Sequence, residues 1–148
     1  MALVIRTFAP ADEAAVIALW QAAGLTRPWN DPHADIARKQ TVQPELFLVG
    51  ELGDEIVATA MAGYDGHRGS VYYLAVAPAH HRSGHARAVM AEVERRLTAL
   101  GCPKLNLMVR HDNSAATGFY ERIGYDEQAV VTLGKRLIVD EPGSGGRA

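Results

Sequence analysis

A short segment between a predicted strand and a predicted helix carries the clearest chemical signal in this sequence. It spans residues 77–86, where Arg82 and Ser83 stand just before Gly84, and Ala86 follows two residues later. The first N–H groups of a helix have no partners inside the helix and carry partial positive charge, so they bind anions. Small residues let a phosphate approach such a backbone closely, and Arg82 and Ser83 can add charge and hydrogen bonds. The segment therefore predicts either a phosphate site or an ordinary helix start.

Other binding motifs do not match this segment. The glycine triplet of G-x-G-x-x-G and the Gly-Lys-Ser/Thr of the P-loop are both absent. His80, His81 and His85 lie here, and the last two have the i, i+4 spacing of a helical metal pair. No glutamate or third ligand accompanies them in the H-E-x-x-H manner, so we predict no metal site.

A second candidate segment runs from Asn113 to Tyr125. Asn113 is a suitable N-cap for a helix that reaches about Ile123, and Gly124 is a suitable residue to end it. Tyr120 lies inside this predicted helix. Its ring can pack on a sheet, or its hydroxyl can take part in chemistry.

The elements that must position these two segments alternate between strands and helices. Apolar runs and apolar positions at helical spacing give the coarse order βααβββαβαβ. The predicted strands cover residues 3–8, 46–49, 56–61, 71–76, 105–109 and a closing region, 125–138. The predicted helices begin at Asp12, Asp31, about Gly84 and Asn113.

The strands on either side of the long helix, 71–76 and 105–109, are expected to be parallel and joined by a right-handed crossover. The hairpin before them, with its turn at residues 52–54, favours antiparallel pairing. We therefore expect an α/β fold of mixed α+β character, with a twisted mixed sheet and helices on both faces. The 148 residues fit a single domain, assigned to residues 1–140, with residues 141–148 as a flexible polar tail.

Composition excludes several classes of protein. The formal net charge is −2, so no basic surface for nucleic acid or anionic lipid is indicated. Hydrophobic residues make up 48% of the chain, as in ordinary globular proteins, but no apolar stretch approaches the ~20 residues of a membrane helix. The N-terminus lacks a signal-peptide core, and a single cysteine, Cys102, excludes an internal disulfide. We expect a cytoplasmic protein.

Taken together, the two candidate segments resemble the GNAT superfamily of N-acetyltransferases. That family's phosphate motif, Arg/Gln-x-x-Gly-x-Gly/Ala, falls on residues 81–86, with His81 in the Arg/Gln position. Its later motif is an Asn that starts a helix, a Tyr within that helix and a Gly-Phe/Tyr end. Asn113, Tyr120 and Gly124-Tyr125 match those places.

The resemblance extends over about residues 3–138, and the order of elements agrees throughout. Two loops, residues 27–32 and 63–69, also resemble a narrower group of small bacterial members, the YpeA-like acetyltransferases. The resemblance therefore implies a small bacterial enzyme with the GNAT fold.

The resemblance also implies how acetyl-CoA, the co-substrate, is bound without a metal. The cofactor would lie in a V-shaped gap where two parallel central strands splay apart. Backbone groups of Leu74, Ala75 and Val76 would pair with its pantetheine arm. Its pyrophosphate would meet the phosphate motif and the helix start, namely His81, Arg82, Ser83, Gly84, His85 and Ala86. Asn113 either reaches the cofactor or only caps its helix.

The chemistry implied is direct transfer of an acetyl group from a thioester to a primary amine. Tyr120 would be the general acid that protonates the departing thiolate, because a tyrosine with a pKa near ~10 stays protonated at neutral pH. Asp65 and His67, in the glycine-rich loop, are the nearest polar candidates for the base or acceptor site. The turn chemistry of Asp and Gly explains that loop equally without catalysis.

Arg27, Trp29 and Asn30 lie between the first two helices, where this family builds its acceptor wall, although Trp29 can also be a plain hydrophobic contact. The acceptor stays open between a small-molecule amine, a protein N-terminus and a lysine side chain. We expect an acyltransferase that acts as a monomer or homodimer. The alternative is a catalytically silent module that binds acyl-CoA for regulation.

Overall fold

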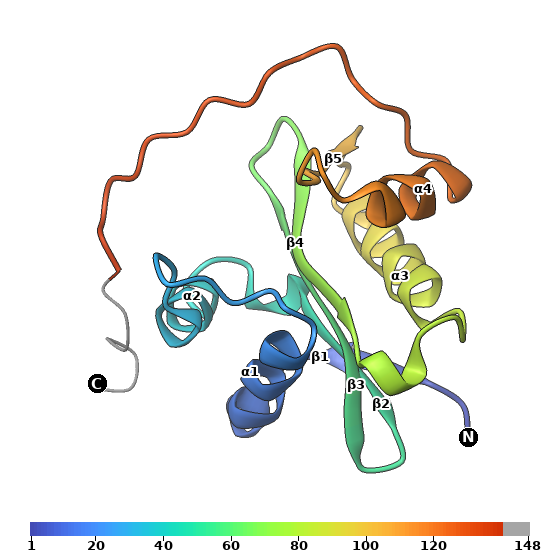
Figure 1. The fold of residues 1–148 in the computed structure, drawn as a ribbon. Helices are drawn as coiled ribbons and strands as arrows, with labels where there is room; N and C mark the ends of the chain where they lie inside the picture. The colour runs from blue at the N-terminus through green and yellow to red at the C-terminus, as the bar shows by residue number, and fades with distance from the viewer. Residues whose placement is uncertain (141–148) are drawn as a thin grey trace.

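Five strands form one mixed sheet in the computed structural model, which describes residues 1–140, and α-helices cover both faces of that sheet (Figure 1). The strands are β1 (Val4–Thr7), β2 (Phe47–Leu52), β3 (Glu55–Tyr64), β4 (Gly69–Val76) and β5 (Leu105–Asn106). The helices are α1 (Glu13–Ala22), α2 (Pro32–Lys39), α3 (His85–Ala99) and α4 (Ser114–Arg122). The strands lie in chain order, antiparallel from β1 to β4 and parallel between β4 and β5. The mixed α/β fold expected from the sequence is confirmed.

Capping residues and a glycine mark the helix ends at the positions expected from the sequence. Asp31 caps α2, because its Oδ1 accepts a hydrogen bond from the backbone N–H of His33 at 2.9 Å. Asn113 caps α4 by accepting from the backbone N–H of Ala116 at 3.1 Å. The chain leaves α3 through Gly101, whose φ of +84° a residue without a Cβ adopts at no steric cost.

Each face of the sheet has its own apolar core. On one face, α3 buries its apolar positions, Val89, Met90, Val93 and Leu97, against the sheet. On the other face, α1 and α2 bury Val16, Ile17, Leu19, Trp20 and Ile36. Successive residues of a strand point to opposite faces, so β2 supplies Leu48 to the first core and Phe47 and Val49 to the second.

The predicted closing strand over residues 125–138 is wrong. The described chain after α4 contains no strand, and Figure 1 shows it curving away from the sheet. Its apolar side chains are exposed, Val131 by 87% and Leu137 by 86%. β5 ends at Asn106 and is therefore shorter than the predicted 105–109. An alternating apolar pattern shows that a segment can form a strand, but the strand forms only where a neighbouring edge pairs with it.

The far end of this segment is attached to α2. Arg136 donates to Asn30 Oδ1 at 3.0 Å, and the buried carboxylate of Asp140 accepts from Arg38 Nη2 at 2.5 Å and from the backbone N–H of Asp31 at 3.2 Å. The domain boundary after residue 140 stays a prediction. The predicted tail, residues 141–148, lies outside the described residues.

β4 carries a bulge at Tyr73 that redirects the strand in its middle. Thr59 of β3 pairs with Ala75, but Met61 pairs with Tyr72, so β4 has an extra residue over this stretch. Tyr73 has a φ of +54°, in the left-handed region that non-glycine residues rarely adopt. Bulges bend a strand and increase its twist, and they are frequent beside active sites.

Contacts from α1, α2 and β3 hold Tyr73 in this conformation. Its carbonyl accepts from the Thr59 hydroxyl at 2.9 Å, and that hydroxyl accepts from the Trp20 indole N–H at 2.9 Å. The Tyr73 ring stacks on Trp20 with centroids 3.8 Å apart. Its hydroxyl donates to Asp35 Oδ2 at 2.7 Å. The bulge is therefore fixed from one face of the sheet.

We expect Thr59→Val to lower the free energy of unfolding by about 2–3 kcal/mol, because it leaves the buried Trp20 N–H and the Tyr73 carbonyl without a partner. Thr59→Ser is the control, since it keeps the hydroxyl and loses only a methyl group, at a cost of about 1 kcal/mol. Urea unfolding followed by tryptophan fluorescence measures both. Equal stability of the two variants would show that the hydroxyl does not hold the bulge.

Candidate active site

One edge of β4 is open from Val71 to Val76 in the described structure. β4 pairs with β5 only at its first two residues, Gly69 and Ser70, and the two chains then separate (Figure 1). The parallel pair lies at the edge of the described sheet, because no closing strand covers β5. An open edge presents backbone N–H and C=O groups with which an extended ligand can pair. The predicted pantetheine contacts at residues 74–76 lie on this stretch, directly after the bulge.

The loop between β4 and α3 presents a run of free backbone N–H groups. From Arg82 to Arg87, no backbone N–H donates to an acceptor within residues 1–140. Arg82 and Gly84 both have left-handed φ values, +64° and +83°, and such a conformation turns successive N–H groups toward one side. These groups lie just before the 15-residue helix α3 and in its first turn, where the helix dipole adds positive charge. The arrangement suits a phosphate or pyrophosphate.

Three predicted cofactor contacts in this region have local partners. His81 Nε2 lies 3.0 Å from the carbonyl oxygen of Val76, and a ring nitrogen that faces a carbonyl must donate its hydrogen. Ser83 Oγ donates to the carbonyl of His80. The Asn113 oxygen caps α4. The side chains of His81, Ser83 and Asn113 therefore stabilise the end of β4, the loop before α3 and the start of α4, respectively.

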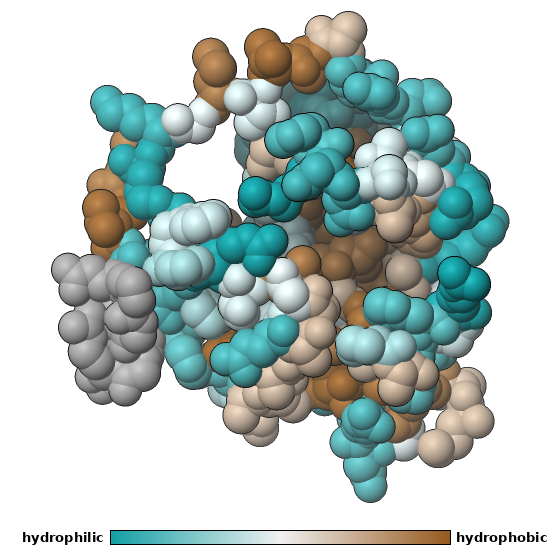
Figure 2. Space-filling model, viewed as in Figure 1, coloured by the Kyte–Doolittle hydropathy of each residue, from teal (hydrophilic) through white to brown (hydrophobic). Residues whose placement is uncertain are grey.

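Tyr120 lies on α4 and packs against the same core as Leu74 and Val76 of the open strand edge. Its ring meets Tyr125 edge-on, with centroids 5.7 Å apart. Burial raises the pKa of Tyr120 to about 12, and its hydroxyl has no hydrogen-bond partner within residues 1–140. The structure thus gives Tyr120 an unpaired hydroxyl on the α3 side of the sheet, beside the core that Leu74 and Val76 also contact. In Figure 2, apolar surface is recessed between polar groups in this region.

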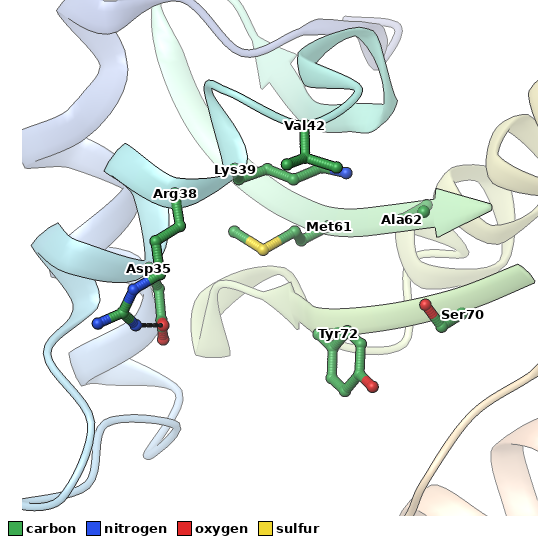
Figure 3. A pocket seen from close by; sticks show the side chains of 9 residues that line it. Asp35, Arg38, Lys39, Val42, Met61, Ala62, Ser70 and Tyr72 are labelled. Atoms are coloured by element: carbon green, nitrogen blue, oxygen red, sulfur yellow. Dashed lines mark hydrogen bonds and ion pairs between the residues drawn. The ribbon is translucent and has the colours of Figure 1, made fainter. Parts of the chain in front are cut away.

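A pocket of about 300 Å³ lies on the opposite face of the sheet, between α2 and the strands β3 and β4 (Figure 3). Asp35, Arg38 and Lys39 line it from α2. Met61 lines it from β3, and Ser70 and Tyr72 line it from β4, just before the bulge. The size is that of a small-ligand site.

Asp35 is the site residue that the sequence did not reveal. Its carboxylate accepts from the Tyr73 hydroxyl at 2.7 Å and from Arg38 Nη1 at 3.1 Å. In the sequence, Asp35 appears as an acid in the first turn of a helix, where it favours the helix dipole. No local signal connects it with a strand residue 38 positions away.

The structure places Asp65 and His67 away from this pocket, in the exposed turn between β3 and β4. Asp65 Oδ1 accepts from the backbone N–H groups of His67 and Arg68, each at 2.8 Å. These hydrogen bonds hold the pKa of Asp65 below its usual value, which makes the carboxylate a weaker base. Its observed contacts are those of a turn-forming residue.

None of the three residues of the predicted acceptor wall, Arg27, Trp29 and Asn30, lines the observed pocket, and the Asn30 oxygen accepts from Arg136 at 3.0 Å. The Arg27 guanidinium donates to the carbonyls of Gly24 and Thr26, at 2.7 and 2.9 Å, and so holds its own loop. Trp29 is 51% exposed. The observed pocket is instead lined by residues of α2, β3 and β4.

The described residues contain no cluster of three His, Cys, Asp or Glu side chains that could hold a metal ion. None of the helices within residues 1–140 is long and apolar enough to span a membrane.

We expect Gly84→Val to raise the Kd for CoA about tenfold, because a β-branched residue resists the left-handed conformation by ~1–2 kcal/mol and the loop loses its preorganised N–H groups. Gly101→Val is a matched control at the other end of α3. Its φ is +84° against +83° at Gly84, and an added Cβ meets nothing within 4 Å at either position. Titration calorimetry with CoA compares the two variants. Equal loss of affinity would mean that the loop conformation is not what binds CoA.

Residues 14–125 of this chain match the model of the acetyltransferase (GNAT) family. An acetyltransferase of Yersinia enterocolitica is 53% identical over 137 residues, which are 93% of this chain and 97% of that protein.

Solved structures agree with this match. The crystal structure of Ard1 from Thermoplasma volcanium superposes with a TM-score of 0.78 at 26% identity, covering 87% of this chain and 86% of that one. The PaiA N-acetyltransferase of Thermoplasma acidophilum, solved in complex with coenzyme A, gives a TM-score of 0.71 at 14% identity and covers 88% and 94% of the two chains. The latter likeness concerns the fold alone.

Proposed function

The chain belongs to the acetyltransferase (GNAT) family, and on this premise we propose that it transfers an acetyl group from acetyl-CoA to a primary amine held in the α2 pocket. One observation carries the proposal. A continuous path leads from the free N–H groups of residues 82–87, along the open edge of β4, to the bulge at Tyr73. The unpaired hydroxyl of Tyr120 and the pocket flank that path on opposite faces of the sheet.

The chain's backbone fits CoA at both ends of this path. The N–H groups of residues 82–87 would hold the pyrophosphate without any need for a positively charged surface. The backbone of residues 74–76 would pair with the amides of pantetheine, as a neighbouring strand would. This orientation directs the thioester toward the bulge, where the pocket begins. PaiA, which has the same fold, was solved with coenzyme A and supports this use of the fold.

Two side chains are assigned to the proton transfers. The acceptor amine must lose a proton to become nucleophilic, and Asp35 would receive that proton directly or through water. The amine nitrogen then bonds to the acetyl carbon while the bond from that carbon to sulfur breaks. Tyr120 would donate a hydrogen bond from its hydroxyl to the departing sulfur and so stabilise the thiolate. The earlier candidates for the base, Asp65 and His67, stay predictions that the assay below can compare with Asp35.

The pocket favours a small molecule as the acceptor. Its volume of about 300 Å³ lies at the lower end of small-ligand sites. Its lining combines apolar contacts, such as Met61 and Tyr72, with charged groups from α2. A protein N-terminus or a lysine side chain would have to enter the same space.

A free-thiol release assay tests the proposed function. Acetyl-CoA is incubated with the protein and a panel of small primary amines, and released CoA is measured with a thiol reagent. We expect release that depends on an amine acceptor and yields the N-acetyl product by mass spectrometry. Binding of acetyl-CoA with no amine-dependent release would instead identify the chain as a regulatory acyl-CoA-binding module.

The proposal also includes a cytoplasmic bacterial enzyme that acts without nucleic acid, as a monomer or homodimer. Its support is the Yersinia relative and the net charge of −2. Size-exclusion chromatography with light scattering decides the oligomeric state, and a DNA-binding assay at low salt decides the question of nucleic acid.

A further inference from the structure

Lys39 lines the α2 pocket with a largely buried side chain, and its ammonium group has no acid bound to it within residues 1–140. The residue is only 9% exposed, yet within residues 1–140 its Nζ makes no hydrogen bond and no ion pair. Burial lowers the pKa of Lys39, and the carboxylate that counteracts this shift is Glu45, which lies on the exposed surface. Because the ammonium group is partly shielded from water and has no bound acid, an anion that enters the pocket gains a charged partner there.

The other charges of the pocket are already paired. The Asp35 carboxylate accepts from Arg38, and Arg38 also donates to Asp140 at 2.5 Å. These contacts leave Lys39 as the pocket-lining cation that has no bound acid within the described chain. The pocket therefore favours a negative group at Lys39.

The space around the Lys39 nitrogen is open on the side of β3 and β4. A Cβ added to Gly63 would lie 3.6 Å from Gln43 Oε1, 3.7 Å from Lys39 Nζ and 3.8 Å from Ser70 Oγ, so the two donors Lys39 and Ser70 and one amide oxygen lie around a residue that has no side chain. In Figure 3, the Lys39 side chain extends over β3 between Val42 and Met61. An anionic group placed here would receive hydrogen bonds from Lys39 and from the Ser70 hydroxyl.

We propose that the acceptor is a small amine that also carries an anionic group, a carboxylate or a phosphate, which binds Lys39 and Ser70 while the amine lies at Asp35. This inference rests on the proposed function. Residues four apart on a helix have Cβ atoms ~5–6 Å from each other, so Asp35 and Lys39 contact the two ends of one small molecule. The side chains of Met61 in β3 and Tyr72 in β4 would make apolar contacts with the ligand.

Paired acceptors test this inference. Free amino acids and dipeptides are compared with their C-terminal amides, and phosphoethanolamine is compared with ethanolamine. We expect kcat/KM to be 10- to 100-fold higher, in round numbers, for the anionic member of at least one pair, as hydrogen bonds to charged groups allow. The two types of pair distinguish a carboxylate from a phosphate.

Lys39→Met removes the charge but keeps a long apolar side chain in the pocket. The lysine ammonium makes no hydrogen bond or ion pair within residues 1–140 that the substitution would break, so this variant is expected to fold. We expect it to lose the preference, so that the kcat/KM values of the anionic and uncharged members of each pair become nearly equal. Lys104→Met, at an exposed lysine, is the matched control and should keep the preference.

Binding measurements separate this inference from the proposed function. Anionic and uncharged members of each pair are titrated into the CoA-bound protein, wild type and Lys39→Met, by calorimetry. Lys39-dependent binding of the anionic member without thiol release would uphold the anion site and reject the enzyme. Thiol release with equal kcat/KM for both members of every pair, or an equal effect of Lys39→Met on both, would reject the anion site. Failure of every anionic member to bind would reject it as well.

Discussion

Replacing Tyr120 with phenylalanine is expected to lower kcat about 10²-fold, at the lower end of the ~10²–10⁴ range of general acids. The reason is the strength of the lost interaction. A hydrogen bond from Tyr120 to a developing thiolate is a bond to a charged group, worth ~1.5–3 kcal/mol. With a pKa of about 12, Tyr120 is a hydrogen-bond donor more than a source of full proton transfer to a thiolate, whose pKa as a thiol is ~8.5.

The matched control for this variant is Tyr125→Phe. Tyr125 packs against Tyr120, but its hydroxyl donates to Glu94 at 2.5 Å and is therefore already occupied. Stopped-flow measurement of thiol release, with CoA affinity from calorimetry, should show a loss of kcat only in Tyr120→Phe. An equal loss in both variants would indicate that the aromatic cluster supports the fold of the site and that Tyr120 has no role as an acid.

The pH dependence of kcat in the wild-type protein is a second test of the role of Tyr120. A general acid must be protonated, so activity falls as pH rises through its pKa. Because the pKa of Tyr120 is raised to about 12, this residue should cause no loss of kcat up to pH ~10. A fall in kcat near pH 8 that is absent from Tyr120→Phe would contradict this assignment.

Asp35→Asn is the second variant with a large expected effect, a decrease in kcat/KM of about 10²–10⁴-fold. Asparagine has nearly the same shape and its oxygen still accepts from the Tyr73 hydroxyl, so the bulge should keep its conformation. What is lost is the negative charge that attracts the amine and takes its proton. Initial rates of thiol release at saturating acetyl-CoA measure the effect.

Two controls are needed to interpret the effect of Asp35→Asn: the stability and CoA affinity of the variant, and the activity of a variant at a second carboxylate. Urea unfolding shows whether the variant remains folded, and calorimetry shows whether CoA still binds. Asp65→Asn, in the β3–β4 turn, is measured in parallel. A large loss in Asp65→Asn with normal rates in Asp35→Asn would place the base in the turn and reject Asp35.

The free N–H groups between β4 and α3 were predictable because they depend on local geometry, and their role in binding phosphate stays a prediction. The sequence of residues 82–86 already indicates a helix start with small residues, and the free N–H groups of that start follow from helix geometry alone. Asp31 and Asn113 cap their helices for the same reason, since a cap involves residues only two or three positions apart. The order of strands and helices followed from apolar spacing, with the closing strand as the exception.

The predicted closing strand shows that apolar spacing alone does not establish that a strand forms. Residues 125–138 have the composition of a strand, but strand pairing depends on whether a partner edge is within reach. In the structure the nearest edge, β5, is two residues long and pairs only with the start of β4. The segment instead ends at α2 through Asp140 and Arg38, a contact over 102 positions in the chain.

The sequence by itself determined the helices, their caps and the free N–H groups at the start of α3, because each depends on contacts between near neighbours in the chain. The contacts of the candidate acceptor pocket were decided only by the tertiary structure. Asp35 meets Tyr73 across 38 positions, and Lys39 converges with Ser70 over Gly63 only because α2 packs on the face of β3 and β4. Such contacts depend on how two apolar faces pack together, and that packing has no signature in any short stretch of sequence.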